Sequence, residues 1–330
     1  FHIFNACLVY LLAYSFIRNH FDSKKALGIS FFTALLFAIH PVQVETVCWI
    51  SASKIVLSTF FYLSALICYI QYMRNSKWQY LLASVVSSIL AMGCKEQSVI
   101  IVPCLLLFDW MLFKRNMRSL KVYIEKVYYL IPAIAIFIVT LVANKDTGEE
   151  IIGYTIVDRF IFLCYSVFKY LLISAIPFKL SYLYPFPFQV GEKIPMALWI
   201  YPFVILFIGY VIYLNRRKPL LVFCTLFFIL HLLPVLHVIP LPRYVVAADR
   251  YLYIPYIAFA IGLSILSYHL YERQRKWILY AGFLYCSYLC IYTADYAPAW
   301  KNSDTLKEHF KEVLKKRETN LSINYKNEKQ

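Results

Sequence analysis

Long apolar stretches alternate with short polar gaps from Phe1 to about residue 295. About eleven such stretches occur, centred near residues 9, 33, 64, 86, 106, 136, 168, 206, 229, 259 and 286. Several are about 15 to 18 residues long, which is the short end of what a helix needs to cross about 30 Å of hydrocarbon. The pattern predicts an all-α, polytopic membrane helix bundle.

Basic residues gather in five of the polar gaps. The clusters are Arg18, Lys24 and Lys25; Arg74 and Lys77; Lys114, Arg115, Arg118, Lys121 and Lys126; Arg216, Arg217 and Lys218; and Arg273, Arg275 and Lys276. Loops rich in Lys and Arg stay in the cytoplasm, so these five gaps are expected there. The gaps expected on the outer face are 41–54, 94–98, 144–159, 178–196, 239–249 and the chain after 295.

The stretch near residue 168 lies between the gaps 144–159 and 178–196. This assignment puts both of these gaps on the outer face of the membrane. Lys169 lies in the middle of that stretch, and an ammonium group facing lipid is costly. We therefore expect about ten spans, together with one helix that lies along the outer interface or lines a wet cavity.

Composition agrees with a membrane protein. The 330 residues are 61% hydrophobic and 15% charged, which is too apolar for a soluble domain of this length. The net charge of +15 is explained by the cytoplasmic gaps, so a nucleic-acid partner is not expected. The nine cysteines lack paired spacing and indicate neither a disulfide framework nor a metal knuckle.

The chain divides into two parts. Residues 1–298 form the membrane domain, and residues 299–330 form a polar tail with helical spacing. The chain opens with Phe1 inside an apolar run, so we expect the N-terminal part of this domain to precede it. The tail is expected to lead toward a further domain.

Charged residues beside apolar stretches on the outer face are the candidates for chemistry. Residues 40–54 contain His40, Glu45 and Lys54. If this stretch is helical, His40 and Glu45 can face one cavity. The alternative is an interfacial helix anchored by Trp49.

Two further outer stretches carry charge. Lys95 and Glu96 lie between two apolar runs. Ionisable groups are costly there unless they are paired or face water, so a functional site is expected. The alternative is a Lys–Glu pair in a simple interfacial loop. Residues 240–255 contain Arg243, Asp249 and Arg250, followed by Tyr251. The planar donor fork of arginine suits a phosphate. Aromatic anchoring with a surface Asp–Arg pair is the alternative.

Five of these motifs occur in an order that resembles a known family. They are HPVQVETVCWISASK, CKEQSVIIVP, YLYPFP with Tyr184, AADRYLYIP and WKNSDTLKEHF. The chain is similar to the membrane region of tetratricopeptide-repeat-containing O-mannosyltransferase-like proteins, more closely to the bacterial branch, which belong to the GT-C class of glycosyltransferases. The resemblance implies a GT-C-like fold and covers most of residues 1–315.

The resemblance also implies an activity. Such enzymes move a sugar, here mannose-like, from a polyprenyl-phosphate carrier to a hydroxyl of a protein or glycan on the non-cytoplasmic face, with helical repeats following on that side. The site would face the periplasm or exterior from a bacterial inner membrane, or the endoplasmic reticulum lumen in a eukaryote. The family's acidic pair lies in an outer loop before the span that corresponds to the start of this chain, so the presumed base is absent here.

The transfer needs carboxylates, cations for the phosphate and an apolar groove for the lipid. The catalytic candidates are Glu45, Glu96 and His40. The substrate-binding candidates are Arg250, Lys95, Arg243, Asp249, Lys54, Tyr184 and Tyr251. Mg²⁺ or Mn²⁺ could be held by carboxylates with a phosphate, although no outer gap shows a D-x-D pair.

Two other classes of protein remain open at this point. A transporter or lipid flippase would line its path with paired charges, but it predicts matching broken helices in two halves, and Lys95-Glu96 has no counterpart in the second half. A non-catalytic membrane anchor for a repeat domain would leave the outer charges as mere surface.

The loop charges make a prediction about topology. In a cysteine-free background, single cysteines at Ser53 and Asn116 should react with an impermeant maleimide from opposite sides of the membrane, because only Asn116 lies in a basic gap. Labelling of both positions from the same side would overturn the map.

Overall fold

The computed structural model describes residues 1–143, 153–181, 183–236, 245–309 and 311. The described residues are 80% helical, and the one β contact among them is an isolated antiparallel bridge between Tyr184 and Ala247. The all-α prediction is therefore confirmed. The α-helices are α1 (His2–Ile17), α2 (Ser23–Ile39), α3 (Val44–Cys48), α4 (Ser53–Asn75), α5 (Trp78–Cys94), α6 (Ile101–Met111), α7 (Leu120–Ala143), α8 (Ile156–Ala175), α9 (Ile200–Leu214), α10 (Pro219–Leu232), α11 (Pro255–Arg273) and α12 (Arg275–Tyr296).

Short 3₁₀ turns connect several of these helices. They are η1 (Pro41–Gln43), η2 (Ile50–Ala52), η3 (Glu96–Ile100), η5 (Met196–Trp199), η6 (Asp249–Leu252) and η7 (Ala297–Trp300). Helix ends follow ordinary capping chemistry. The Asp22 side chain accepts from the Lys25 amide at the start of α2, and Thr155 forms a reciprocal capping box with Asp158 at the start of α8.

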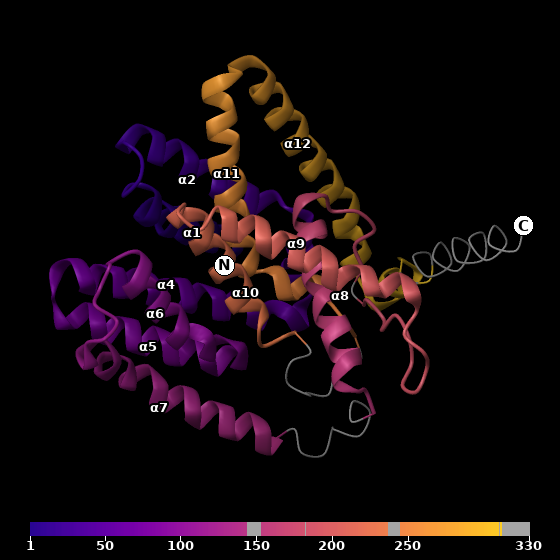
Figure 1. The fold of residues 1–330 in the computed structure, drawn as a ribbon, viewed down its shortest axis with the longest axis horizontal. Helices are drawn as coiled ribbons and strands as arrows, with labels where there is room; N and C mark the ends of the chain where they lie inside the picture. The colour runs from indigo at the N-terminus through magenta and orange to yellow at the C-terminus, as the bar shows by residue number, and fades with distance from the viewer. Residues whose placement is uncertain (144–152, 182, 237–244, 310, 312–330) are drawn as a thin grey trace, which may run out of the picture.

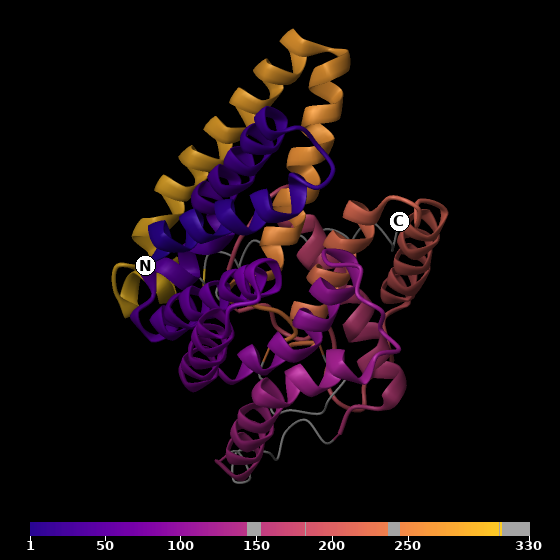
Figure 2. The same ribbon diagram turned by 90° about the vertical axis from the view of Figure 1, so that its left-hand side faces the viewer.

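Helices from distant parts of the chain pack side by side. α1 lies against α2 and α4, α4 packs along α5, and α2 packs against α11. Figures 1 and 2 show α11 and α12 as a helical hairpin that rises beside α1 and α2, while α4 to α7 gather on another side of the molecule. The core is rich in large aromatic side chains, among them Tyr62, Phe108 and Tyr256.

Four helical segments are long and apolar enough to cross a membrane: Ile50–Asn75, Leu120–Thr140, Met196–Leu214 and Arg275–Trp300. A fifth candidate is the pair Ser23–Ile39 and Pro41–Cys48, which is bent by 52°. These segments support membrane association. By length and apolar composition the described helices do not give ten spans. Helices α1, α5 and α10 are apolar but only 16, 17 and 14 residues long.

The stretch that contains Lys169 forms α8, which is not among the candidate spans. The Lys169 ammonium lies 4.9 Å from the centre of the Tyr184 ring, so it points toward protein. The predicted position of α8 along the outer face stays a prediction.

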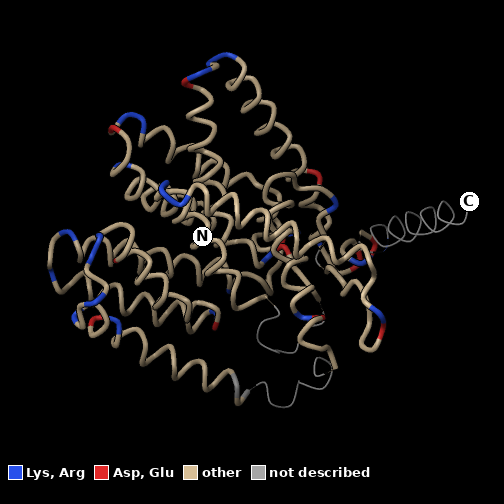
Figure 3. Tube along the Cα trace, in the orientation of Figure 1, with Lys and Arg blue, Asp and Glu red and all other residues tan. Residues whose placement is uncertain are grey.

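One basic residue counted with the polar gap after α6, Lys126, lies within a helix and is buried; the side of the membrane on which this gap lies stays a prediction. Lys126 belongs to α7, is 3% exposed, and lies 2.6 Å from the fully buried carboxylate of Asp109 on α6. The Tyr69 hydroxyl donates to the same carboxylate at 2.6 Å. Arg115 bridges Asp109 and Glu125 at 3.5 and 2.5 Å. Most other basic side chains do lie at the turns, as Figure 3 shows for the turn between α11 and α12.

This buried cluster predicts a strong effect of breaking one pair. Lys126→Met should lower the free energy of unfolding by about 3 kcal/mol, because Asp109 would keep a buried charge with only the more distant Arg115 to balance it. Equilibrium unfolding in mixed micelles measures this, with Lys121→Met, an exposed lysine of the same helix, as the control. Equal stability of the two variants would contradict the prediction.

Candidate functional site

Glu45 and Arg250 form a buried ion pair between segments 205 residues apart. Glu45 lies on α3 and is fully buried, whereas Arg250 lies on η6 with its side chain 19% exposed. The Arg250 guanidinium donates to Oε1 at 2.5 Å, and the Arg250 backbone amide donates to Oε2 at 2.8 Å. Both carboxylate oxygens are therefore occupied by one residue, and the pair fixes α3 against η6.

The His-Pro sequence at the end of α2 brings Glu45 to this place. His40 has extended backbone angles, as expected for a residue before proline, and Pro41 opens η1. The His40 ring caps this turn, because Nδ1 accepts from the Val42 amide at 3.2 Å. The chain then bends back as α3, with Glu45 in its first turn.

Asp249 lies next to Arg250 but binds elsewhere. Its carboxyl is fully buried and accepts a hydrogen bond of 2.8 Å from the Tyr184 hydroxyl. Burial, reinforced by the negative charge of Glu45, raises the pKa of Asp249 well above its ordinary value. Burial thus favours the protonated form of Asp249. The alternative of a surface Asp–Arg pair does not describe this segment, because Asp249 binds Tyr184 and Arg250 binds Glu45.

Helix α8 supports the segment that leads into η6. The Ser166 hydroxyl donates to the Val246 carbonyl at 3.1 Å, and the Ala248 amide donates to the Tyr170 hydroxyl at 3.3 Å. The Val246 amide also donates to the carbonyl of Tyr184 at 2.9 Å. Lys169, on the same helix, brings a cation to the Tyr184 ring. The second half of α8 and the segment leading into η6 therefore form one unit.

Aromatic rings enclose the Arg250 guanidinium. Its central carbon lies 5.7 Å from the Trp49 ring centre and 5.0 Å from that of Tyr251. Trp49 in turn lies 5.8 Å from Trp300, which ends η7 after α12. The aromatic contacts and the ion pair hold the guanidinium in one orientation, and 19% of the Arg250 side chain is exposed.

Lys95 and Glu96 form a second group. Their side chains pair at 2.5 Å at the start of η3, with Lys95 16% and Glu96 44% exposed. Although burial acts in the opposite sense, the Lys95 ammonium and more weakly Lys54 lower the pKa of Glu96. Among the described residues, no ion pair joins this group to Glu45 and Arg250.

The structure thus sorts the predicted site residues into groups. Glu45, Asp249, Arg250, Tyr184 and Tyr251 come together; Lys54, Lys95 and Glu96 form the second group; and His40 packs on Tyr256 with ring centres 4.3 Å apart. Arg243 lies outside the described residues. Within the described part of the chain, no group of three or more His, Cys, Asp or Glu side chains is arranged to hold a metal ion.

Sequence reasoning missed two contributors to the site. Trp49 was assigned to membrane anchoring, although its ring faces Arg250. Lys169 was recognised as unusual, but its position beside Tyr184 and near Asp249 was not foreseen. The sequence feature that pointed to Lys169 is a lysine within an apolar helix. Burying its charge is costly unless the side chain reaches a polar or aromatic partner.

The chain matches no protein-family model, none of the curated proteins and no solved structure. The site therefore has to be interpreted from its own geometry.

The arrangement is suited to holding an anion. Arg250 and Lys169 bring two cations to this group, and Glu45 pairs with one of them. A guanidinium has five N–H donors, of which Arg250 directs one to Glu45 and one toward Tyr251. The Arg250 side chain is 19% exposed, and its remaining donors suit a phosphate or carboxylate.

The raised pKa of Asp249 predicts that the effect of Asp249→Asn on stability depends on pH. In the unfolded chain Asp249 ionises above about pH 3.9, whereas the folded protein keeps it protonated to higher pH. Its contribution to stability is thus fully present at acidic pH and is lost as the pH rises toward the raised pKa. The stability of Asp249→Asn relative to the unsubstituted protein should increase from pH 4 to pH 8.

Thermal unfolding at several pH values measures this difference. Asp304→Asn, which changes an exposed aspartate, is the control and should show no such trend. A difference for Asp249→Asn that is independent of pH, or that falls as the pH rises, would contradict the prediction.

Proposed function

We propose that the protein is a membrane glycosyltransferase with a GT-C-like bundle of about ten spans. It would move a mannose-like sugar from a polyprenyl-phosphate carrier to a protein or glycan hydroxyl on the non-cytoplasmic face. The order of the five motifs suggests the class. The observation that carries the proposal is Arg250, which is held by Glu45 and two aromatic rings and whose side chain is 19% exposed.

Arg250 is proposed to bind the carrier phosphate. Charged hydrogen bonds from a guanidinium to phosphate are short and directional, and they gain strength in a partly dry site. Glu45 then acts as a positioning residue, because both of its oxygens are already occupied by Arg250. This role differs from direct participation of Glu45 in proton transfer.

In the proposed reaction, the acceptor oxygen forms a bond to the anomeric carbon of the sugar. The bond between that carbon and the phosphate oxygen breaks, and its electron pair leaves with the polyprenyl phosphate. Arg250 and Lys169 would balance the charge that develops there. The proton of the acceptor hydroxyl passes to a carboxylate, and Glu96 is the candidate because it is ionised and 44% exposed.

The proposal predicts how substitutions at Arg250 act. Arg250→Ala should lower kcat/KM for transfer by roughly ten- to a hundredfold, the effect of losing one charged hydrogen bond to the phosphate. Arg250→Lys should recover part of this loss, because it keeps the charge and loses the planar fork. The measurement is transfer of labelled sugar from a polyprenyl-phosphate donor by the full-length protein in nanodiscs.

The control is Arg217→Ala, which removes an exposed arginine from the turn between α9 and α10. Gel filtration and thermal unfolding identify any loss of fold in the Arg250 variants, since truncation leaves Glu45 buried without its cation. A folded Arg250→Ala variant with full transfer activity would exclude Arg250 as the phosphate ligand. No transfer by the unsubstituted full-length protein from any polyprenyl-phosphate sugar would exclude the proposed function.

A further inference from the structure

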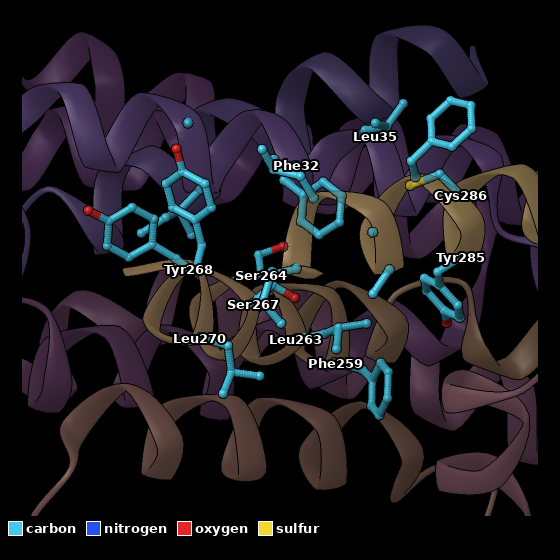
Figure 4. A pocket seen from close by; sticks show the side chains of 18 of the residues that line it. Phe32, Leu35, Phe259, Leu263, Ser264, Ser267, Tyr268, Leu270, Tyr285 and Cys286 are labelled. Atoms are coloured by element: carbon cyan, nitrogen blue, oxygen red, sulfur yellow. The ribbon is translucent and has the colours of Figure 1, made fainter. Parts of the chain in front are cut away.

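An apolar groove of about 650 Å³ lies between α2, α11 and α12, away from the Glu45–Arg250 pair. Its walls include Ile29, Phe32, Leu263, Leu279 and Phe283. Figure 4 shows the hydroxyls of Ser264 and Ser267 near the middle of the groove, with Tyr268 toward one end and Tyr285 and Cys286 toward the other.

Two glycines leave the groove open. Gly28 on α2 and Gly282 on α12 both line it, and a Cβ atom added at either position would meet no other atom within 4 Å. Neither glycine is needed for close packing of one helix on another. The space above them is available to a ligand.

The length of the groove fits one membrane leaflet. The lining runs from Phe259 to Tyr271 on α11, from Gly28 to Leu35 on α2 and from Ile278 to Cys286 on α12. At 1.5 Å per residue these runs are about 18, 10 and 12 Å long, whereas half of the hydrocarbon is about 15 Å thick. A volume of 650 Å³ holds about twenty groups the size of a water molecule, which corresponds to one acyl chain.

One end of the groove is basic. Lys24 lies one helical turn before Gly28, and Arg275 lies one turn before Ile278, so both side chains share a helix face with the lining. Lys25 joins α2 to α11 by a 2.8 Å ion pair with Glu272. Within the described residues, neither Lys24 nor Arg275 has an acidic partner. The turns at this end carry Arg18, Lys24, Lys25, Arg273, Arg275 and Lys276 against Asp22 and Glu272, which leaves a net charge of +4.

The other end leads away from this charge. There the Tyr285 hydroxyl donates to the Ala175 carbonyl at 2.8 Å, so α12 is tied to the end of α8. The lining of α2 stops at Leu35, five residues before His40. The groove is thus reached most directly from the leaflet at the basic end, opposite to the end where Arg250 lies.

We propose that this groove binds one anionic phospholipid from the leaflet at the basic end. One acyl chain lies between α2, α11 and α12, and the phosphate of the headgroup lies beside Lys24 and Arg275. Charge selects the headgroup, and the space above Gly28 and Gly282 accepts the chain. This lipid is separate from the carrier in the proposed reaction, so the site does not depend on the proposed function.

The test uses the full-length protein in nanodiscs with equal amounts of phosphatidylglycerol and phosphatidylcholine. After transfer to mild detergent, native mass spectrometry counts the retained lipids. The unsubstituted protein should retain one phosphatidylglycerol. Gly282→Leu, whose side chain fills the groove, should lower its occupancy at least tenfold.

Gly209→Leu is the matched control, because Gly209 lies on α9 in a different apolar groove and also has open space above it. Gly28→Leu provides a second test should Gly282→Leu fail to yield a folded protein. Leucine favours helix more than glycine does, so these variants are expected to fold.

Removal of the basic groups tests the headgroup separately. Combined Lys24→Gln and Arg275→Gln should keep a lipid in the groove but lower the preference for phosphatidylglycerol by roughly fivefold for each charge removed. Three results would overturn the proposal: equal retention of both lipids by the unsubstituted protein, equal loss in Gly282→Leu and Gly209→Leu, or displacement of phosphatidylglycerol by added polyprenyl phosphate. The last would assign the groove to the carrier.

Discussion

The arrangement of α3 and η6 depends on one ion pair, between Glu45 and Arg250. A carboxylate with no exposure to solvent is expensive unless its charge is balanced and its oxygens are hydrogen-bonded. Arg250 meets both requirements, with its guanidinium and its backbone amide. Since the partners are 205 residues apart, forming this pair places η6 against α3. The positions of Asp249 and Tyr251 then follow from their neighbour.

The second buried charge cluster, around Asp109 and Lys126, makes an instructive contrast. There Tyr69, Arg115 and Glu125 surround the central pair, and the interactions within the cluster account for its charges. Such a network fixes how α4, α6 and α7 pack. At the other site Arg250 has one carboxylate partner, Glu45, and two aromatic rings lie beside its guanidinium. Arg115 and Arg250 are similarly exposed, at 17% and 19%, but Arg115 lies between two carboxylates. The smaller number of carboxylate partners is the feature that suggests ligand binding at Arg250 and packing at Arg115.

The sequence predicted the class of fold better than the details of its charges. Apolar stretches with basic gaps were enough to predict a helical membrane protein, because burial and loop charge act locally along the chain. Glu45, Asp249 and Arg250 were found because charges beside apolar runs are costly. Their pairing was not predictable, since Arg250 prefers Glu45 to its sequence neighbour Asp249 only once α2 bends at His40-Pro41. The burial of Lys126 was not predictable for the same reason, because its partner lies on another helix.

The apolar groove and the charged site are linked through Tyr256. Its ring packs on His40, which caps the turn before Glu45, and on Phe259, which lines the groove. Tyr256 is fully buried, so a shift of α11 would move His40 and the start of α3 as well. Occupation of the groove by a chain would hold α11 against α2 and α12 and would oppose such a shift. The groove and the Glu45–Arg250 site are therefore linked through packed side chains.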